Sequence, residues 1–504
     1  MSEPARQKVS TALRGRERLR PTRPDWAGTD TPAHRRPLPL ITREALGRTE
    51  TGPTVHRLAK KNNDWYGEGW SPRMAELRER AAAIRRETLR DLEGYLRQLT
   101  ENVEAVGGRV HRARTPEEAA RTVQEIARRE GTRLAVKSKS MVGEEMHLTS
   151  HLEELGVEVV ETDLGEYIVQ LADERPAHII APAVHKSRAD VHALFEELAD
   201  ERLPGAPEEL TAFARRRLRE DFHTADMGIS GVNFAAADTG TLTLVTNEGN
   251  ARMVTSQPRI HVALMTVEKV IPRFEDLATL IPLLTYAATN EKVSVYQTMV
   301  TGPRRDGEAD GPEQLHLVIL DNGRTDLLGG KYEEALACIR CGACQIACPV
   351  FRTVGGGHAY ASVYGGPIGA VLTPLIGDRE EGADLPFLSS LCGACGDVCP
   401  VKIPLPDMLV DLRADYVDGH AASTSGRVAR AGWSAWSRLW DTSAGYRLSL
   451  AMSRLAGRVL PSAVLSRAGG TMSRGWASGR TLPPLREAGA FRRWLRERGN
   501  GGQR

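Results

Sequence analysis

Seven cysteines carry the most specific chemistry in this chain of 504 residues, and all of them lie between positions 338 and 399. The first four, in the stretch CIRCGACQIACP, are Cys338, Cys341, Cys344 and Cys348. Three thiolates at C-x2-C-x2-C spacing can bind one face of a cubane iron–sulfur cluster, and the fourth cysteine of this bacterial pattern ligates the other cluster of a pair. The spacing therefore predicts iron–sulfur chemistry.

A second stretch, SSLCGACGDVCP, repeats the spacing of the second, third and fourth cysteines of the first, and Ser389 falls where the first cysteine would stand. The crossed assignment of such paired motifs predicts two clusters with unequal ligand sets. The expected ligands of the first cluster are Cys338, Cys341, Cys344 and Cys399. The expected ligands of the second cluster are Cys348, Cys392 and Cys395.

The fourth corner of the second cluster has three alternatives on the sequence alone. The cluster could be a three-iron centre, a four-iron centre with Ser389 or another oxygen as ligand, or a four-iron centre with bound water. A lost iron or a non-thiolate ligand changes the net charge of the cluster, which is one determinant of its reduction potential. We favour a four-iron assembly that loses its unique iron easily.

Structural zinc and disulfides are the other roles that clustered cysteines play. Zinc binds C-x2-C pairs, but it gives no reason for the longer run of four cysteines followed by proline. The seven cysteines are odd in number and no signal peptide is recognised, which favours reduced thiolates in the cytoplasm over a disulfide framework. We therefore expect two iron–sulfur clusters and a cytoplasmic location.

Four regions follow from composition and hydrophobic periodicity. Residues 1–72 are basic and predict a largely irregular arm with one docked segment near Trp65 and Trp70. Residues 73–330 alternate helical patterns with short apolar strands, which predicts an α/β domain with a mostly parallel sheet covered on both faces. Residues 331–415 place the cysteines between helical flanks, and residues 416–504 form a basic region. Strands are expected over 109–113, 133–140, 157–163, 177–184, 240–246, 260–267 and 315–321.

Four basic residues of the α/β domain are expected at the ends of two strands. They are Lys137, Lys139, His185 and Lys186. Ligands of open α/β sheets bind beyond the carboxyl ends of the strands, so these residues predict a site for a small anionic molecule. Ordinary surface and turn chemistry is the alternative. No dinucleotide or Walker fingerprint is present, and no residue is assigned a catalytic role.

The net charge of +2 hides a basic C-terminal region. From Ala421 to Arg504 there are 15 arginines, no lysine and three acidic residues, together with the tryptophans Trp433, Trp436, Trp440, Trp476 and Trp494. Docking on a partner protein is the preferred interpretation, and peripheral contact with an anionic membrane is the second. Nucleic-acid binding is not expected, and no apolar run is long enough to cross a bilayer.

Several stretches resemble the lactate utilisation protein B family. They are VKSKSMVGEEMHL, VVETDLGEYIVQL, GISGVNFAAADTGTLTLVTNEGNAR, LHLVILDNGR and the two cysteine stretches. The resemblance implies an α/β domain of the sugar-phosphate isomerase and CoA-transferase-like type, followed by a helical two-cluster ferredoxin domain. It also implies a second cluster with three cysteine ligands, and a role as the iron–sulfur subunit of a three-protein complex that oxidises L-lactate to pyruvate.

The expected function is therefore electron transfer, together with two other lactate-utilisation subunits. Oxidation of a 2-hydroxy acid releases two electrons, and two clusters can accept them one at a time. The chain is not expected to be active alone. The alternative is a stand-alone α/β enzyme acting on a small anion, with sensory or structural clusters, and its first candidate residues would be Lys137, His185 and Asp238.

Overall fold

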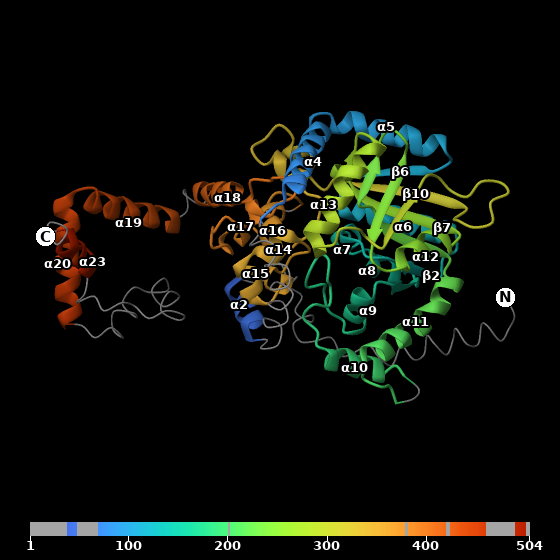
Figure 1. Ribbon diagram of the computed structural model, residues 1–504, viewed down its shortest axis with the longest axis horizontal. Coiled ribbons are helices and arrows are strands. Elements are labelled where there is room, and N and C mark those ends of the chain that lie inside the picture. Colours follow the sequence, from blue (N-terminus) through green and yellow to red (C-terminus); the bar gives the residue numbers. More distant parts are fainter. Residues whose placement is uncertain are drawn as a thin grey trace. The chain divides into compact units, whose positions relative to one another are not determined.

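The computed structural model describes residues 38–47, 69–199, 202–377, 382–419, 424–459 and 489–499. The chain divides into two compact units, residues 1–414 and residues 415–504. The first unit contains both sheets and all seven cysteines. Figure 1 labels the elements of each unit.

A six-stranded sheet forms the centre of the first unit, and all its strands run parallel. Three of its strands, β4, β7 and β10, have almost no exposed residues, as expected where helices cover both faces of a parallel sheet. In spatial order the strands are β1 (Arg109–Ala113), β10 (Gln314–Leu320), β7 (Ile260–Thr266), β4 (Met227–Gly231), β2 (Leu134–Lys137) and β3 (Glu158–Glu161). The prediction of a mostly parallel α/β sheet is confirmed.

Alternating side chains of β7 enter two different cores. Val262 and Leu264 pack in a core with α6 (Pro116–Arg129), whereas Ala263 and Met265 pack in a core with α5 (Leu92–Ala105). Successive residues of a strand point to opposite faces, so this division places the two helices on opposite sides of the sheet. Helix α6 starts where the sequence TPEE predicts a start, because the Thr115 hydroxyl caps it and proline occupies its first turn.

The remaining helices of the α/β region continue these layers. They are α4 (Pro72–Arg90), α7 (Met141–Glu145), α8 (Leu148–Glu153), α9 (Leu164–Leu171), α10 (Arg188–Glu196), α11 (Pro207–Thr224), α12 (Asn250–Ser256) and α13 (Leu277–Thr289), with short 3-10 turns η2 (Val267–Lys269), η3 (Phe274–Asp276) and η4 (Thr325–Leu327). A small second sheet contains β8 (Val270–Ile271), β5 (Phe234–Ala236), β6 (Thr241–Thr246) and β9 (Tyr296–Val300) in that order.

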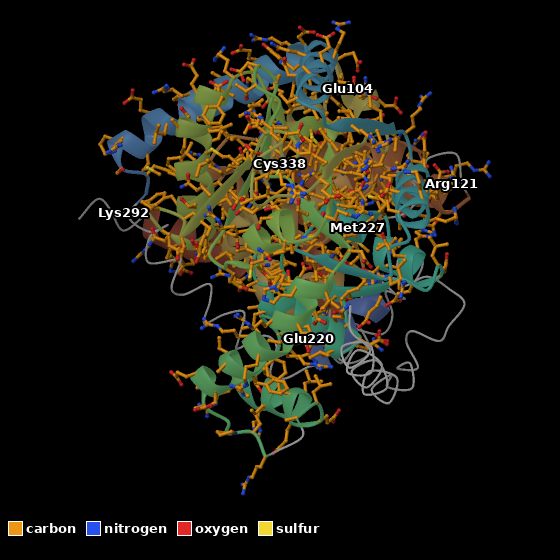
Figure 2. All side chains as sticks on the ribbon, turned by 90° about the vertical axis from the view of Figure 1, so that its right-hand side faces the viewer. Glu104, Arg121, Glu220, Met227, Lys292 and Cys338 are labelled. Carbon is orange, nitrogen blue, oxygen red and sulfur yellow. The ribbon has the colours of Figure 1, made fainter. Side chains whose placement is uncertain are left out.

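Burial follows residue type in this unit. Figure 2 shows the labelled charged side chains at the outside of the molecule and the labelled Met227 and Cys338 further inside. The charged residues that the figure labels are Glu104, Arg121, Glu220 and Lys292, and all four are exposed.

The strand predicted over residues 177–184 is wrong, because this segment is an irregular loop. The backbone N–H groups of Ile180 and Ala181 donate to the His178 side chain rather than to a neighbouring strand. Pro182 has no N–H to donate to a sheet ladder. The apolar run is buried by packing against the cysteine region instead of by a sheet, since Ala177 accepts a hydrogen bond from Gly357.

The cysteine region shares one hydrophobic core with α4 and α13 of the α/β region. The helices and 3-10 turns of this region are short up to Asp397, and the last helix, α18, has 15 residues. They are η5 (Glu333–Ala337), α14 (Ala343–Ala347), α15 (Pro349–Val354), η6 (Gly357–Tyr360), α16 (Gly366–Leu372), η7 (Leu385–Phe387), α17 (Ala394–Asp397) and α18 (Leu405–Gly419).

Two parts of the predicted terminal regions are also described. The arm contains α2 (Leu38–Gly47), and Trp70 at its end donates a hydrogen bond to the Asp397 carbonyl oxygen at 3.1 Å. Trp65 lies outside the described residues. The predicted docking of this segment therefore holds for Trp70.

The second unit contains α19 (Thr424–Trp440), α20 (Ser443–Val459) and α23 (Ala490–Gly499). Its exposed apolar side chains include Trp433, Trp436 and Trp440 on α19, Leu448, Met452 and Leu455 on α20, and Phe491 and Trp494 on α23. Trp476 lies outside the described residues. No helix in the described part of the chain has the length and apolar character that crossing a bilayer requires. The docking role of this unit stays a prediction.

Candidate functional site

The first cysteine loop begins where the 3-10 turn η5 ends, at Cys338. Two residues of the loop have left-handed backbone conformations, Arg340 with φ 61° and Gly342 with φ 75°. These turns expose the Arg340 N–H to the loop interior, where it donates to the Cys338 sulfur at 3.4 Å. Helix α14 starts immediately afterwards and carries Cys344.

The second cysteine loop repeats this backbone conformation 51 positions later in the sequence. Leu391 has φ 54° and Gly393 has φ 86°, in the places of Arg340 and Gly342. Helix α17 starts at the corresponding position and carries Cys395. The two loops are therefore related by structure as well as by cysteine spacing.

Ser389 has the place in the second loop that Cys338 has in the first. Its Oγ accepts a hydrogen bond from the N–H of Leu391 at 3.1 Å, as the Cys338 sulfur accepts one from Arg340. The overlay made from the sequence, which put Ser389 in the slot of the missing cysteine, agrees with this contact.

Burial and neighbouring thiols raise the pKa of several cysteines. Burial and the nearby Cys338 raise the pKa of Cys341 and of Cys344 well above the usual thiol range, and burial raises the pKa of Cys399 to about 11 with Cys338 again contributing. Burial and two other thiols, Cys348 and Cys392, raise the pKa of Cys395 to about 12. Cys395 also raises the pKa of Cys344, so these shifts do not separate the two predicted ligand sets.

The donor set fits iron–sulfur clusters. None of the seven cysteines forms a disulfide, and six of the seven are at least partly buried. Thiolates in such surroundings need compensating positive charge, which iron ions supply, and backbone N–H groups that donate to sulfur add to it. One such donor is the Ile403 N–H, which lies 3.3 Å from the Cys399 sulfur. The assignment of individual ligands stays a prediction.

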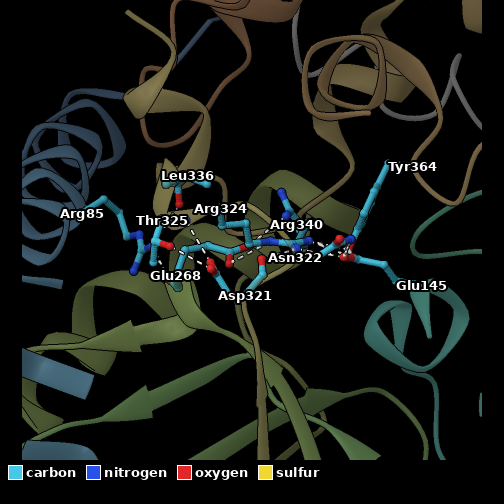
Figure 3. Close-up of polar contacts among 10 residues, drawn as sticks. All are labelled: Arg85, Glu145, Glu268, Asp321, Asn322, Arg324, Thr325, Leu336, Arg340 and Tyr364. Carbon is cyan, nitrogen blue, oxygen red and sulfur yellow. Dashed lines mark hydrogen bonds and ion pairs between the residues drawn. The ribbon is translucent and has the colours of Figure 1, made fainter. Parts of the chain in front are cut away.

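A buried network of charged side chains lies beside the first loop (Figure 3). Glu268, in the 3-10 turn η2 that follows β7, accepts a hydrogen bond from the Arg340 guanidinium at 2.8 Å and pairs with Arg324 at 3.3 Å. Burial opposes the charge of Glu268, but Arg324 and Arg340 hold its pKa at about 2. The α/β region thus supplies the counter-charge for an arginine inside the cysteine loop.

The same network continues to helix α7. Arg324 forms two hydrogen bonds with the Glu145 carboxylate, at 2.7 and 2.8 Å, and the Tyr364 hydroxyl donates to the same carboxylate at 2.7 Å. Arg324 has no exposed surface and Glu145 is almost completely buried. Because bidentate arginine–carboxylate pairs fix the relative orientation of both groups, this network locks the cysteine region onto the sheet.

Helix α4 adds two further arginines to this contact. Arg85 is buried and donates to the backbone carbonyl oxygens of Glu268, Val270 and Ala337. Arg78 donates to the Cys399 carbonyl oxygen at 2.7 Å. Both loops that carry the expected ligands of the first cluster are therefore held by α4.

The loop at residues 177–184 packs on the other side of the first cysteine loop. A Cβ atom added to Gly342 would lie 3.3 Å from the His178 ring, which explains the small residue at this position. The His178 Nδ1 atom accepts two backbone N–H groups, and burial lowers the pKa of His178 to about 3. This histidine is therefore neutral and carries its proton on Nε2.

The predicted anion site is not assembled as the sequence implied. Lys137 is fully buried, and its ammonium lies 2.5 Å from Glu161, 3.1 Å from Glu144 and 3.7 Å from Glu166. Glutamates therefore neutralise a lysine that the sequence assigned to an anionic ligand. Lys139 is half-buried nearby, where burial lowers its pKa while Asp163 opposes the effect.

His185 and Lys186 belong to a separate contact. Both bind the Glu174 carboxylate, His185 at 2.5 Å and Lys186 at 2.6 Å. Asp238, the third candidate of the alternative enzyme, accepts the Phe274 N–H at 2.9 Å and so caps a 3-10 turn. The structure thus places Lys137, His185 and Asp238 in three different sets of contacts.

Sequence reasoning missed the glutamates and arginines that make these pairs. Glu161 ends a strand and Glu166 follows five positions later, so acidic residues at strand ends were a usable signal. Glu268 and Arg324 had no such signal, because each reads as an ordinary charged residue beside a strand.

Two family models match this chain. The LUD domain matches residues 96–320, and the 4Fe-4S dicluster domain matches residues 334–403. The second match covers all seven cysteines. A crystal structure of a DUF162 family protein from Deinococcus radiodurans covers 46% of this chain and 98% of its own at 13% identity, with a TM-score of 0.26 that is too low to support an argument.

Curated relatives match over most of their length. Lactate utilization protein B of Bacillus thuringiensis (strain Al Hakam) is 44% identical over 92% of this chain and 95% of the relative. The proteins of the same name from Oceanobacillus iheyensis and Shouchella clausii are 45% and 50% identical, over 84% and 67% of this chain and 88% and 71% of the relatives. The chain therefore belongs to the lactate utilization protein B family.

Proposed function

We propose that this protein is an iron–sulfur electron-transfer subunit that acts in the oxidation of L-lactate to pyruvate. The proposal depends most on one observation, the presence of seven free cysteines inside a region that matches a 4Fe-4S dicluster domain. The name of its relatives supplies the substrate. Clusters bound there would accept and pass on single electrons.

The residues proposed to hold the first cluster are Cys338, Cys341, Cys344 and Cys399, and those for the second are Cys348, Cys392 and Cys395. The surrounding chain contributes backbone N–H donors to the sulfurs and excludes water from the first group. The N–H donors stabilise the reduced, more negative state of a cluster, whereas burial away from water disfavours it. The protein would thereby set when each centre accepts an electron.

Partner subunits are part of the proposal. No flavin or nicotinamide fingerprint occurs in the sequence, so the group that takes hydrogen from lactate is expected on another chain. The two other lactate-utilisation proteins are the proposed partners, and the basic second unit with its exposed tryptophans is the proposed docking element. The cytoplasm is the proposed location, since reduced clusters persist there.

The test uses the full chain purified without oxygen. Iron and sulfide analysis should return about eight of each per chain when both clusters hold four irons. Lactate should bleach the cluster absorbance only after the partner subunits are added. Rapid turnover of lactate by the isolated chain with an artificial acceptor, or zinc in place of iron, would contradict the proposal.

A further inference from the structure

We infer that Ser389 is the fourth ligand of the second cluster, binding its unique iron through Oγ. This inference rests on the proposed function, because it requires that the second group of cysteines holds a cluster. It goes further in assigning the corner that the cysteines leave open. The chemical class of the ligand is a serine alkoxide, in place of a thiolate or a water molecule.

The two loops place Ser389 where a cluster ligand is expected. Ser389 precedes Cys392 by three residues, as Cys338 precedes Cys341. The left-handed residue that follows donates its N–H to Ser389 Oγ at 3.1 Å, the same contact that Cys338 receives. Because backbone N–H groups donate to cluster ligands, this contact also prepares an oxygen to carry negative charge.

The backbone around Ser389 is held in place by a separate contact. Arg413 of α18 donates to the carbonyl oxygens of Pro386 and Ser389, both at 2.9 Å. Its guanidinium also lies over the ring of Phe387, 5.4 Å from the ring centre. The serine therefore sits in a fixed loop at a defined distance from the cysteines.

Ser389 borders the same pocket as the three cysteines of the second group. The pocket is lined by Cys348, Cys392 and Cys395 together with Ser389, and its other lining residues are Pro349, Pro367, Ser390, Leu391, Gly393, Pro406 and Leu409. These residues come from four separate segments of the chain. Three cysteines and Ser389, the serine at the position of Cys338, would together make up the four donors that a four-iron cluster requires.

Binding of the serine balances in charge and protons. The iron–oxygen bond forms as the hydroxyl proton passes to solvent water, which reaches this half-exposed residue. The corner then carries one negative charge, as a thiolate would, and no electron is transferred. Oxygen is a harder donor than sulfur, so this iron is held less firmly by a soft sulfide cluster than the other three.

Three variants of the full chain test the assignment by spectroscopy. Ser389→Ala removes the hydroxyl, Ser389→Cys supplies the missing thiolate, and Ser390→Ala is the matched control. Ser390 is an exposed neighbour that also borders the pocket, but its place corresponds to Ile339 of the first loop and not to a cysteine. Each protein is purified without oxygen, its iron is counted, and electron paramagnetic resonance follows conversion to a three-iron centre during mild oxidation.

We expect Ser389→Ala to form the three-iron centre about tenfold faster than the wild type, the size of effect that loss of a metal-site contact usually has. Ser390→Ala should match the wild type, and Ser389→Cys should resist conversion. Equal rates for Ser389→Ala and Ser390→Ala would overturn the assignment. Absence of iron from the wild type would instead contradict the proposed function.

A measurement on the wild type alone guards against variants that fail to assemble. In water enriched in a magnetic oxygen isotope, electron–nuclear double resonance detects any solvent oxygen bound to the reduced cluster. With Ser389 as ligand, no solvent coupling is expected. A coupling that exchanges with bulk water would assign the corner to water and overturn the inference.

Discussion

The cysteine loop at residues 338–344 lies against buried charged side chains of the α/β region, whereas the loop at 389–395 lies at the surface of the molecule. Arg340 in the first loop is buried and paired with Glu268, but Leu391 at the same place in the second loop is 40% exposed. Cys341 is buried and its counterpart Cys392 is exposed. The same local backbone conformation therefore occurs in a buried and in an exposed environment.

The two loops show that the cysteine pattern and the surroundings of the loop determine different properties of the site. The pattern fixes how thiolates and N–H groups are arranged within a loop. The setting fixes burial and nearby charge, and those quantities influence the stability and the reduction potential of whatever the loop binds. The proposed inner and outer clusters should consequently respond differently to equivalent substitutions.

The largest difference is expected from removing one equivalent cysteine from each loop. Cys341→Ser should lower the melting temperature by about 10 °C or more, because Cys341 is buried in the core shared with α4 and α13 and the binding energy of a metal centre there is folding energy. Cys392→Ser should lose a similar amount of iron. Its melting temperature should fall by only about a few degrees, because Cys392 is exposed. Thermal unfolding and iron analysis check this, and equal losses of stability would contradict the comparison.

Breaking the buried network should have the next largest effect. Glu268→Gln leaves Arg324 and Arg340 without their shared carboxylate, and we expect a loss of about 3 kcal/mol in the free energy of unfolding. The matched control is Glu334→Gln, since Glu334 pairs with Arg86 at 3.6 Å on the surface. Exposed pairs contribute about 0–1 kcal/mol, so the control should differ little from the wild type in denaturant unfolding.

The charge difference between the loops should also appear in the reduction potentials. Arg340→Leu removes a cation beside Cys338 and should lower the potential of the first cluster by roughly 60 mV, a tenfold change for one electron. Leu391→Arg adds the cation at the equivalent exposed place and should raise the potential of the second cluster by less, because solvent screens it. Redox titrations followed by electron paramagnetic resonance measure both.

Arg340→Lys separates charge from shape in that experiment. It keeps the cation and should restore most of the potential, even though it loses the planar contact with Glu268. A potential that stays low in Arg340→Lys would show that packing, not charge, is responsible.

The smallest effect concerns the neutral His178 that packs on the first loop. Its pKa is about 3 in the folded protein and about 6.5 when unfolded, so its contribution to stability is present above pH 6.5 and is lost as the pH falls toward 3. Between pH 7.5 and 5.5 the loss amounts to about 1 kcal/mol, or roughly 2 °C in melting temperature. His178→Gln should remove this part of the pH dependence, and an unchanged pH dependence would contradict it.

Much of the fold followed from local patterns. The strands at 109–113, 240–246, 260–267 and 315–321 were predicted from apolar runs and observed nearly unchanged. The strand at 177–184 failed because an apolar run shows only that a segment is buried. Whether a sheet or another surface buries it depends on parts of the chain far away in sequence.

The candidate site divides in the same way. Cysteine spacing predicts two unequal ligand sets, which stay a prediction, and it singles out Ser389, because the spacing within each loop obeys local geometry. Acidic residues at strand ends were a signal of nearby negative charge, but the sequence could not predict which glutamates pair with Lys137, His185 and Lys186. Each of those pairs depends on which strands and loops become neighbours in the folded chain. The sequence alone does not distinguish a charged residue that will be paired from one that will be exposed.

Local patterns in the sequence specify the alternation of helices and strands, the two cysteine loops and the serine in the second, since each depends on residues a few positions apart. Which loop is buried depends on tertiary contacts. Arg340 donates a hydrogen bond to Glu268, 72 positions away in the sequence, and Arg85 donates one to the Ala337 carbonyl oxygen, 252 positions away. The strong attraction between such charges arises only after folding has buried them away from water, so a local sequence pattern cannot indicate it.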